Sequence, residues 1–274
     1  MTANDLSDAG FAELTAKISR DRGFGCASYK DKCLRRRIAV RMRARGVHTY
    51  GDYARVLDTD QAEYDRLLDA LTINVTKLFR NWETYDAIAQ KVVPALWARP
   101  KGPISVWSAG CSSGEEPYSL AALFHRHAEQ RSELDELASR VQVLGSDIDA
   151  RCLGAARAGA FAEGDFSDTP VELRRRYFAP TPPFTIVPEV KHLVRFERRD
   201  LLADAPPPGL HQLICCRNVL IYFDRDTQER LFEKFHGALA PDGFLVLGKV
   251  ETLLGSARTR FAAVDGRERI FRPL

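Results

Sequence analysis

A glycine-containing turn followed by two acidic residues is the first place in this sequence where the residue types could do chemistry. The apolar run Ile104–Ser108 leads into the turn Ala109–Gly114, and Glu115 and Glu116 open the helical pattern that follows. Glycine lets a backbone approach a ligand closely, and open α/β sheets bind ligands at the carboxyl ends of their strands. The spacing is neither the G-x-G-x-x-G of a dinucleotide site nor a P-loop ending in Lys-Ser/Thr. Because two acids would repel a phosphate, the turn suits a cationic or amino-bearing ligand.

Two further acids, Asp147 and Asp149, follow the next apolar run, Val141–Ser146. An ionised aspartate only accepts hydrogen bonds, so it can hold both hydroxyls of a ribose. A glycine turn without phosphate-binding features, combined with an acid after the second strand, favours S-adenosylmethionine, which carries a ribose, a sulfonium and an amino acid tail but no phosphate. The alternative is that both aspartates only cap the helix that follows them.

The elements that must position these residues are strands alternating with helices. From residue 104 onward, short apolar runs are separated mostly by helical stretches; the runs are Ile104–Ser108, Val141–Ser146, Leu193–Phe196, Leu213–Cys216 and Phe244–Leu247. Continuous apolar strands that alternate with helices predict a doubly wound parallel sheet covered on both faces. Two apolar runs around Asp265-Gly266 predict a hairpin at the end of the chain.

The first 71 residues have the periodicity of helices, and one of these helices is strongly basic. Eight basic residues and one acid between Lys30 and Arg45 give that stretch a net charge of +7, whereas the whole chain has +3. The helical repeat sets Lys32, Arg36 and Arg43 roughly opposite the apolar stripe of the same helix. A field of that size predicts an acidic partner. A merely solvated face is the alternative, and nucleic acid is the rival partner.

Composition excludes several other classes of protein. The chain has 274 residues, 45% of them hydrophobic, and only 32 are Gly or Pro, so it is not a disordered or low-complexity chain. No apolar run approaches the ~18 residues that span a bilayer, and the first ten residues lack the features of a signal peptide, so we expect a cytoplasmic protein without membrane insertion. Six cysteines without a CxxC pair or a histidine at zinc spacing predict reduced thiols and no metal site.

Several motifs together resemble the chemotaxis receptor methyltransferases, the CheR family. They are TINVTKLFR (72–80), VWSAGCSSGEEPYSLA (106–121), GSDIDARCLGAARAGAF (145–161) and CRNVLIYFD (216–224), the last followed by LAPDGFLVLGKVE (239–251). The resemblance implies methylation of glutamate side chains on the cytoplasmic helices of chemoreceptors, with S-adenosylmethionine as cofactor and S-adenosylhomocysteine as product. It also implies a Rossmann-like methyltransferase domain with a small antiparallel β insert, preceded by an all-α domain. We expect the helical domain over residues 1–71, an interdomain segment over 72–100 and the α/β domain over 101–274, with its insert at about 180–197.

The resemblance also assigns roles to individual residues. It implies cofactor contacts from Asn74, Thr76, Arg80, Gly110, Glu116, Asp147, Asp200, Leu201, Arg217 and Asn218. Asp200 stands where the family commonly has Asn. Arg80 and Tyr222 are the residues expected at the site of transfer, with Arg80 holding the substrate carboxylate or the site architecture. The alternatives are an ion pair between the domains for Arg80 and a core tyrosine for Tyr222. The basic helix, through Lys32, Arg36 and Arg43, is expected to dock the receptor.

Two segments depart from the family pattern. Residues 178–196 are rich in proline and have no glycine, which argues against the β insert that binds a receptor's C-terminal pentapeptide, because proline cannot donate to an added strand. Lys249-Val250-Glu251 stands where the family often has His-Ser-Glu, so the role of that loop is open.

Two alternative functions are a nucleic-acid methyltransferase and a non-catalytic S-adenosylmethionine-binding adaptor. The first is disfavoured because Arg217-Asn-Val-Leu-Ile-Tyr222 replaces the Asn/Asp-Pro-Pro-Tyr/Phe motif that usually methylates bases, so no nucleic-acid partner is expected.

Overall fold

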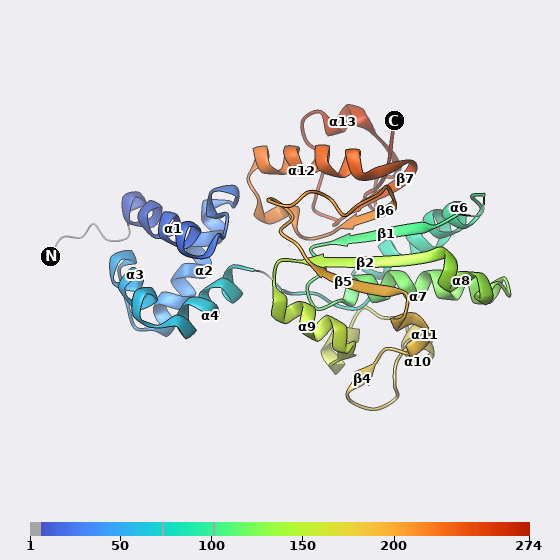
Figure 1. The fold of residues 1–274 in the computed structure, drawn as a ribbon, viewed down its shortest axis with the longest axis horizontal. Helices are drawn as coiled ribbons and strands as arrows, with labels where there is room; N and C mark the ends of the chain where they lie inside the picture. The colour runs from blue at the N-terminus through green and yellow to red at the C-terminus, as the bar shows by residue number, and fades with distance from the viewer. Residues whose placement is uncertain (1–6, 73, 101) are drawn as a thin grey trace. The chain divides into compact units, whose positions relative to one another are not determined.

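The computed structural model describes residues 7–72, 74–100 and 102–274, and the chain forms two compact units (Figure 1). The first unit is built from the described residues that precede Asn74, together with Tyr222–Thr227. The second unit is built from the described residues of 74–221 and 228–274. A short segment from late in the chain therefore folds with the N-terminal helices.

The first unit is helical, as its periodicity predicts. Its helices are α1 (Asp8–Arg22), α2 (Asp31–Ala44), α3 (Tyr50–Thr59) and α4 (Gln61–Leu71), with a 3₁₀ turn at Cys26–Ser28. The side chains of Ser7, Thr49 and Asp60 cap α1, α3 and α4 by accepting backbone N–H groups of the first turn. Their apolar stripes form one core that includes Phe11, Leu14, Ile18, Leu34, Ile38, Met42, Tyr53 and Leu67.

The second unit begins with the irregular segment 74–81, which leads into a helical stretch. That stretch is α5 (Trp82–Ala87), a π-helical turn (Ile88–Val92) and α6 (Val93–Trp97). The remaining helices are α7 (Glu115–Gln130), α8 (Leu134–Arg140), α9 (Ala150–Ala158), α10 (Val171–Tyr177), α11 (Pro188–Lys191), α12 (Arg225–Ala238) and α13 (Ala257–Arg260), of which α12 begins in the Tyr222–Thr227 segment of the first unit.

A seven-stranded sheet forms the centre of the second unit, with β1, β2 and β6 side by side (Figure 1). In spatial order its strands are β5 (Val194–Arg198), β2 (Val141–Asp147), β1 (Ile104–Ala109), β6 (His211–Cys216), β7 (Leu239–Leu247), β9 (Ile270–Pro273) and β8 (Phe261–Asp265). The first five are mutually parallel, and the β8–β9 hairpin adds antiparallel strands at one edge. The predicted α/β fold with its C-terminal hairpin is confirmed. The strands β1, β2, β6 and β7 all have their carboxyl ends at the same end of the sheet, which is where open α/β sheets bind ligands.

A small antiparallel sheet is present, but only one of its two strands lies within the expected insert at residues 180–197. β4 (Phe184–Thr185) pairs with β3 (Ala160–Phe161), which precedes the expected insert. Val194–Arg198 is instead the edge strand of the main sheet, because it pairs in parallel with β2. The insert is therefore closed by two segments that more than twenty residues separate.

Among the described residues, no helix is long and apolar enough to cross a bilayer. In the same part of the chain, no group of three or more His, Cys, Asp or Glu side chains is placed to hold a metal ion.

Candidate functional site

The glycine turn after β1 is held against the ends of two other strands. The N–H groups of Gly110 and Cys111 donate to the carbonyl of Ser146 at the end of β2, at 2.8 and 2.9 Å. Gly110 has φ +78°, and a Cβ atom there would lie 2.6 Å from Val219 Cγ2 in the loop after β6. A side chain at position 110 would thus be strained and would also clash. The turn therefore places backbone without side chains at the carboxyl end of β1, as the sequence predicts for a ligand site.

The two aspartates after β2 have different roles. Asp149 caps α9, because its Oδ1 accepts the N–H groups of Arg151 and Cys152. The carboxylate of Asp147 instead accepts the N–H of Ser112 on Oδ2 at 2.8 Å and that of Asp149 on Oδ1 at 3.0 Å. The capping alternative therefore describes Asp149 and not Asp147.

The geometry of Asp147 fits a ribose. Each carboxylate oxygen offers about two acceptor positions, and each oxygen of Asp147 uses one of them for a backbone N–H. One position on each oxygen is left for a diol. Burial raises the pKa of Asp147, and the N–H groups of Asp149 and Ser112 oppose that shift.

The segment 74–81 reaches both the glycine turn and the end of β2. Asn74 donates from Nδ2 to Asp149 Oδ2 at 2.8 Å, and its Oδ1 accepts the Ser112 hydroxyl at 3.5 Å. The Thr76 side chain lies near enough to Glu115, at the start of α7, to oppose the rise that burial causes in the pKa of its carboxyl group. The structure thus brings Asn74 and Thr76 together with the glycine turn and the end of β2.

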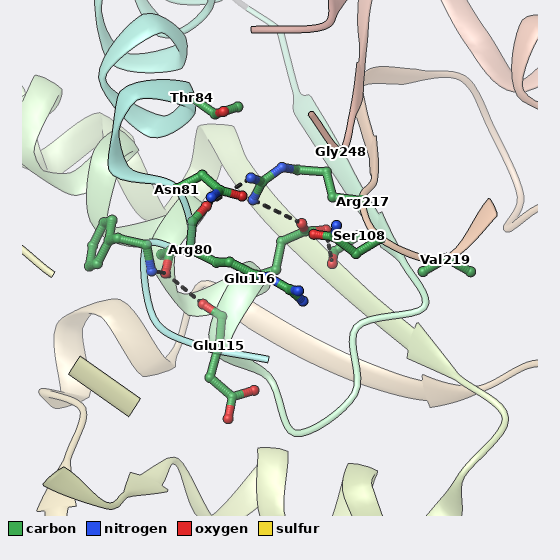
Figure 2. A network of polar contacts seen from close by, with 12 residues as sticks. Arg80, Asn81, Thr84, Ser108, Glu115, Glu116, Arg217, Val219 and Gly248 are labelled. Atoms are coloured by element: carbon green, nitrogen blue, oxygen red, sulfur yellow. Dashed lines mark hydrogen bonds and ion pairs between the residues drawn. The ribbon is translucent and has the colours of Figure 1, made fainter. Parts of the chain in front are cut away.

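The buried Arg217 and the partly buried Glu116 form the centre of a polar network (Figure 2). Arg217 Nη1 lies 3.7 Å from Glu116 Oε2, and Arg217 Nη2 donates to the backbone carbonyl of Arg80 at 2.8 Å. The Ser108 hydroxyl donates to Glu116 Oε1 at 2.8 Å, and the ring of Tyr85 lies 5.0 Å from the Arg217 guanidinium carbon. Burial raises the pKa of Glu116, and Arg217 opposes the shift. Each buried charge thus has a partner that offsets its desolvation.

Arg80 lies on a strained loop that backbone hydrogen bonds hold in place. Its neighbours Phe79 and Asn81 have φ values of +51° and +59°, which non-glycine residues adopt at a cost. Phe79 N–H donates to the Ser119 hydroxyl, and Asn81 N–H donates to Asp168, both at 2.8 Å. The Arg80 side chain donates from Nη1 to the carbonyl of Val75 at 2.7 Å.

Asn218 follows Arg217 with φ +61°. Within the described part of the chain, its buried Oδ1 has no hydrogen-bond donor. A buried acceptor without a protein partner is unfavourable unless a ligand supplies the donor. Together with the acids after β1 and β2, this atom fits an amino-bearing nucleoside such as S-adenosylmethionine.

Asp200 and Leu201 lie in a turn after β5 that is stabilised by local hydrogen bonds. Asp200 Oδ1 accepts the N–H groups of Leu202 and Ala203 at 2.8 and 3.3 Å, and Lys234 Nζ donates to the Leu201 carbonyl at 2.7 Å. An asparagine oxygen could accept the same two N–H groups. The aspartate found here is therefore compatible with the turn.

Tyr222 folds with the first unit, whereas Arg80 and Arg217 belong to the second. Its carbonyl accepts the Lys30 N–H at 2.9 Å, and its ring centre lies 5.9 Å from the Arg37 guanidinium carbon. The structure thus places Tyr222 beside the basic helix and does not place it with Arg80 in one unit.

The cationic side chains of the basic helix α2 fall into two groups, those that bind other residues of the first unit and those that are exposed. Four arginines are engaged within the first unit: Arg35 with Asp8, Arg37 with the Ala70 carbonyl, Arg41 with the buried Glu63, and Arg45 with Asp60. Lys32, Arg36 and Arg43 are exposed, and Val40, which is 49% exposed, lies on the same face between the two arginines. The sequence-predicted docking residues are thus the outward-facing members of the charge run.

Two further buried glutamates, Glu115 and Glu251, lie close to these residues. Glu115 accepts the Ser113 hydroxyl at 2.8 Å, and burial raises its pKa to about 7. Glu251 accepts backbone N–H groups from two loops. The acid-rich motif after the turn pointed to Glu115, whereas no local pattern indicates the partners of Glu251.

Comparison with known proteins agrees with this geometry. Residues 74–270 match the family model described as CheR methyltransferase, SAM binding domain, and residues 9–72 match the CheR methyltransferase all-alpha domain. The chemotaxis protein methyltransferase of Klebsiella aerogenes is 36% identical over 254 residues, which cover 90% of this chain and 84% of that protein. Those of Listeria innocua and Escherichia coli K12 are each 33% identical, over 92% and 90% of this chain and 93% and 85% of the relatives.

These matches confirm the resemblance seen in the motifs and the prediction of S-adenosylmethionine as cofactor. The chain belongs to the CheR methyltransferase family and is an S-adenosylmethionine-dependent methyltransferase.

Proposed function

We propose that this methyltransferase esterifies glutamate side chains on the cytoplasmic helices of chemoreceptors, and that it acts in the cytoplasm, where those helices lie. The observation that carries the proposal is the exposed basic face of α2, formed by Lys32, Arg36 and Arg43. Such a face is complementary to acidic helices, which carry the glutamates to be modified. The names of the relatives, chemotaxis protein methyltransferases, support the same acceptor.

The chemistry of a carboxylate acceptor agrees with the residues at the site. A glutamate with a pKa near 4.3 is already ionised at neutral pH, so its methylation needs no strong general base. S-adenosylmethionine, when bound, supplies a methyl group that the sulfonium has already activated. The protein then has to align the reactants and exclude water.

Individual residues have proposed roles in this alignment. Asp147 accepts the ribose hydroxyls, and Asn218 Oδ1 accepts a donor of the cofactor. Gly110, Asn74, Thr76, Glu116, Arg217, Asp200 and Leu201 complete the cofactor site. Arg80 holds the acceptor carboxylate, and Tyr222 lines the site of transfer.

Recruitment through a receptor's C-terminal pentapeptide is not part of the proposal. β4 has only two residues, Phe184 and Thr185, and Pro182-Pro183 directly precedes it. A strand so short, next to residues that cannot donate a backbone N–H, gives an added peptide few ladder hydrogen bonds.

The test is a labelling assay followed by mild base. The full chain is incubated with methyl-labelled S-adenosylmethionine and either receptor cytoplasmic fragments or RNA. We expect label on the receptor fragment that base releases as methanol, because esters hydrolyse. Label that resists base would indicate N-methylation and contradict the proposal. The absence of any label, with cofactor binding intact, would favour a non-catalytic adaptor.

A further inference from the structure

The carboxylate of Glu251 accepts hydrogen bonds from backbone N–H groups of two loops in the second unit. Its side chain is buried, at 4% exposure. Oε2 accepts the N–H groups of Gly248 at 2.6 Å and Asn218 at 3.0 Å, and Oε1 accepts those of Val219 at 2.9 Å and Ile221 at 3.3 Å. One carboxylate thus joins the loop after β6 to the loop after β7, the neighbouring parallel strand.

The loop after β6 needs such an acceptor. Its N–H groups lie beyond the end of the strand and have no ladder partner, and a buried N–H without an acceptor is costly. Asn218 also has an unfavourable φ of +61°, which surrounding contacts must maintain. A Cβ atom on Gly248 would lie 2.8 Å from both Asn218 N and Glu251 Oε2, so the two loops pack too closely for any side chain there.

The loop that carries Glu251 is itself anchored on its other side. Lys249 Nζ lies 3.0 Å from a carboxylate oxygen of Glu83 in α5 and 3.5 Å from one of Glu268 in the β8–β9 turn. Arg269 Nε also donates to the Lys249 carbonyl at 3.3 Å. These contacts make residues 248–251 a fixed support for the loop after β6.

The supported loop carries groups of the cofactor site. Arg217 immediately precedes it and pairs with Glu116, Asn218 presents the unpartnered Oδ1, and Val219 packs against Gly110 of the glycine turn. We propose that Glu251 is a positioning residue for S-adenosylmethionine, which acts by fixing residues 217–221 and not by contact with the cofactor. The proposal rests on the methyltransferase identity of the chain and not on the acceptor.

The test compares Glu251→Gln with Glu63→Gln in the full chain. An amide has only one accepting oxygen, so Glu251→Gln leaves two of the four N–H groups without an acceptor while keeping the side-chain volume. Glu63 is a matched control, because it is another buried glutamate, bound by Arg41 and Tyr53 in the first unit. The measurements are the dissociation constant of S-adenosylhomocysteine by calorimetry and the unfolding midpoint of each ligand-free variant.

We expect Glu251→Gln to weaken binding by about tenfold or more, the effect of one or two lost hydrogen bonds at the site. Glu63→Gln should lower the unfolding midpoint and leave the dissociation constant unchanged. A Glu251→Gln protein that melts early but binds S-adenosylhomocysteine like the wild type would show a purely structural role and overturn the proposal.

If Glu251→Gln does not fold, Gly248→Ala provides a second test of the proposal. Its added methyl group displaces the same contact and leaves the carboxylate in place. We expect this variant to weaken binding as well, with a raised KM for S-adenosylmethionine. Wild-type affinity in a folded Gly248→Ala protein would overturn the proposal.

Discussion

Arg217 donates a hydrogen bond to the backbone carbonyl of Arg80 at 2.8 Å, although 137 residues separate the two in sequence. This bond joins the loop 74–81 to the end of β6. Because the acceptor is the Arg80 backbone, the link does not depend on the Arg80 side chain. A substitution at position 80 therefore tests the guanidinium without breaking the connection between the two segments.

Arg80→Ala should reduce methyl transfer at saturating S-adenosylmethionine by about ten- to a hundredfold, which corresponds to the loss of one charge-assisted hydrogen bond to the acceptor carboxylate. The measurement is kcat with a labelled cofactor and a receptor fragment. The unfolding midpoint should change little, since the bond from Arg217 remains. A wild-type kcat in this variant would contradict the proposed role of Arg80.

Asp147→Asn should weaken cofactor binding by about tenfold or more. The amide nitrogen would face a backbone N–H or a ribose hydroxyl that needs an acceptor, and an unmet buried donor costs about 1–3 kcal/mol. Asp60→Asn is the control, because Asp60 caps α4 in the first unit and asparagine is also a good N-cap. We expect calorimetry to show a much smaller loss of affinity for Asp60→Asn, and equal losses in the two variants would argue against the ribose role.

Charge reversal on α2 should separate docking from cofactor binding. The double variant Arg36→Glu/Arg43→Glu should lower the rate of receptor methylation steeply and leave the dissociation constant of S-adenosylmethionine unchanged, because neither arginine lies in the second unit. The effect should shrink as salt is raised, since exposed charges are screened. Arg20→Glu on α1, which reverses another exposed charge of this unit, should have little effect.

Arg41→Ala should behave differently from Arg36→Ala. Arg41 bonds to both carboxylate oxygens of Glu63, whose side chain is fully buried, at 3.0 and 2.6 Å. Its removal leaves the buried charge with only the more distant Arg66 at 4.0 Å, and breaking a buried pair typically costs about 3–5 kcal/mol. Thermal unfolding of the full chain should show a clear loss of stability for Arg41→Ala and little change for Arg36→Ala.

Glu115 should make stability fall as the pH rises. Burial raises its pKa from 4.5 to about 7, with a partial opposing effect of the Ser113 hydroxyl. Between these values the folded chain retains a proton that the unfolded chain has lost, so folding is progressively disfavoured up to about pH 7. The full effect is about 3 kcal/mol.

Glu115→Gln removes that ionisation. Urea unfolding should therefore show little difference between the variant and the wild type near pH 4.5 and a more stable variant at pH 8. A difference that does not grow with pH would show that Glu115 ionises as an ordinary glutamate.

The strands and the first-unit helices could be predicted from the sequence because burial leaves a direct pattern there. The predicted runs Ile104–Ser108 and Val141–Ser146 lie within one residue of β1 and β2, since a strand covered on both faces is mostly apolar. β3 and β4 have two residues each, too few to show a period, so the pairing of the small insert could not be foreseen.

The contacts of the site were predictable only in part. Residue types and spacing pointed to Asp147, but both aspartates follow the strand, and only the structure separates the cap from the acceptor of Ser112. Glu251 has partners about thirty residues away in another loop, and their meeting depends on the order of β6 and β7 in the sheet. Sequence periodicity carries no information of that kind.

The segment Tyr222–Thr227 has a consequence for how relatives of this chain can recombine. Family models meet between residues 72 and 74, yet Phe223 bridges to Tyr29, and Asp224 N–H donates to the Ser28 carbonyl at 3.0 Å within the helical unit. The N-terminal helices therefore cannot be exchanged as a self-contained cassette. A chimera that imports a relative's N-terminal helices must also import the residues that match 222–227, or the grafted helices will lose these two contacts.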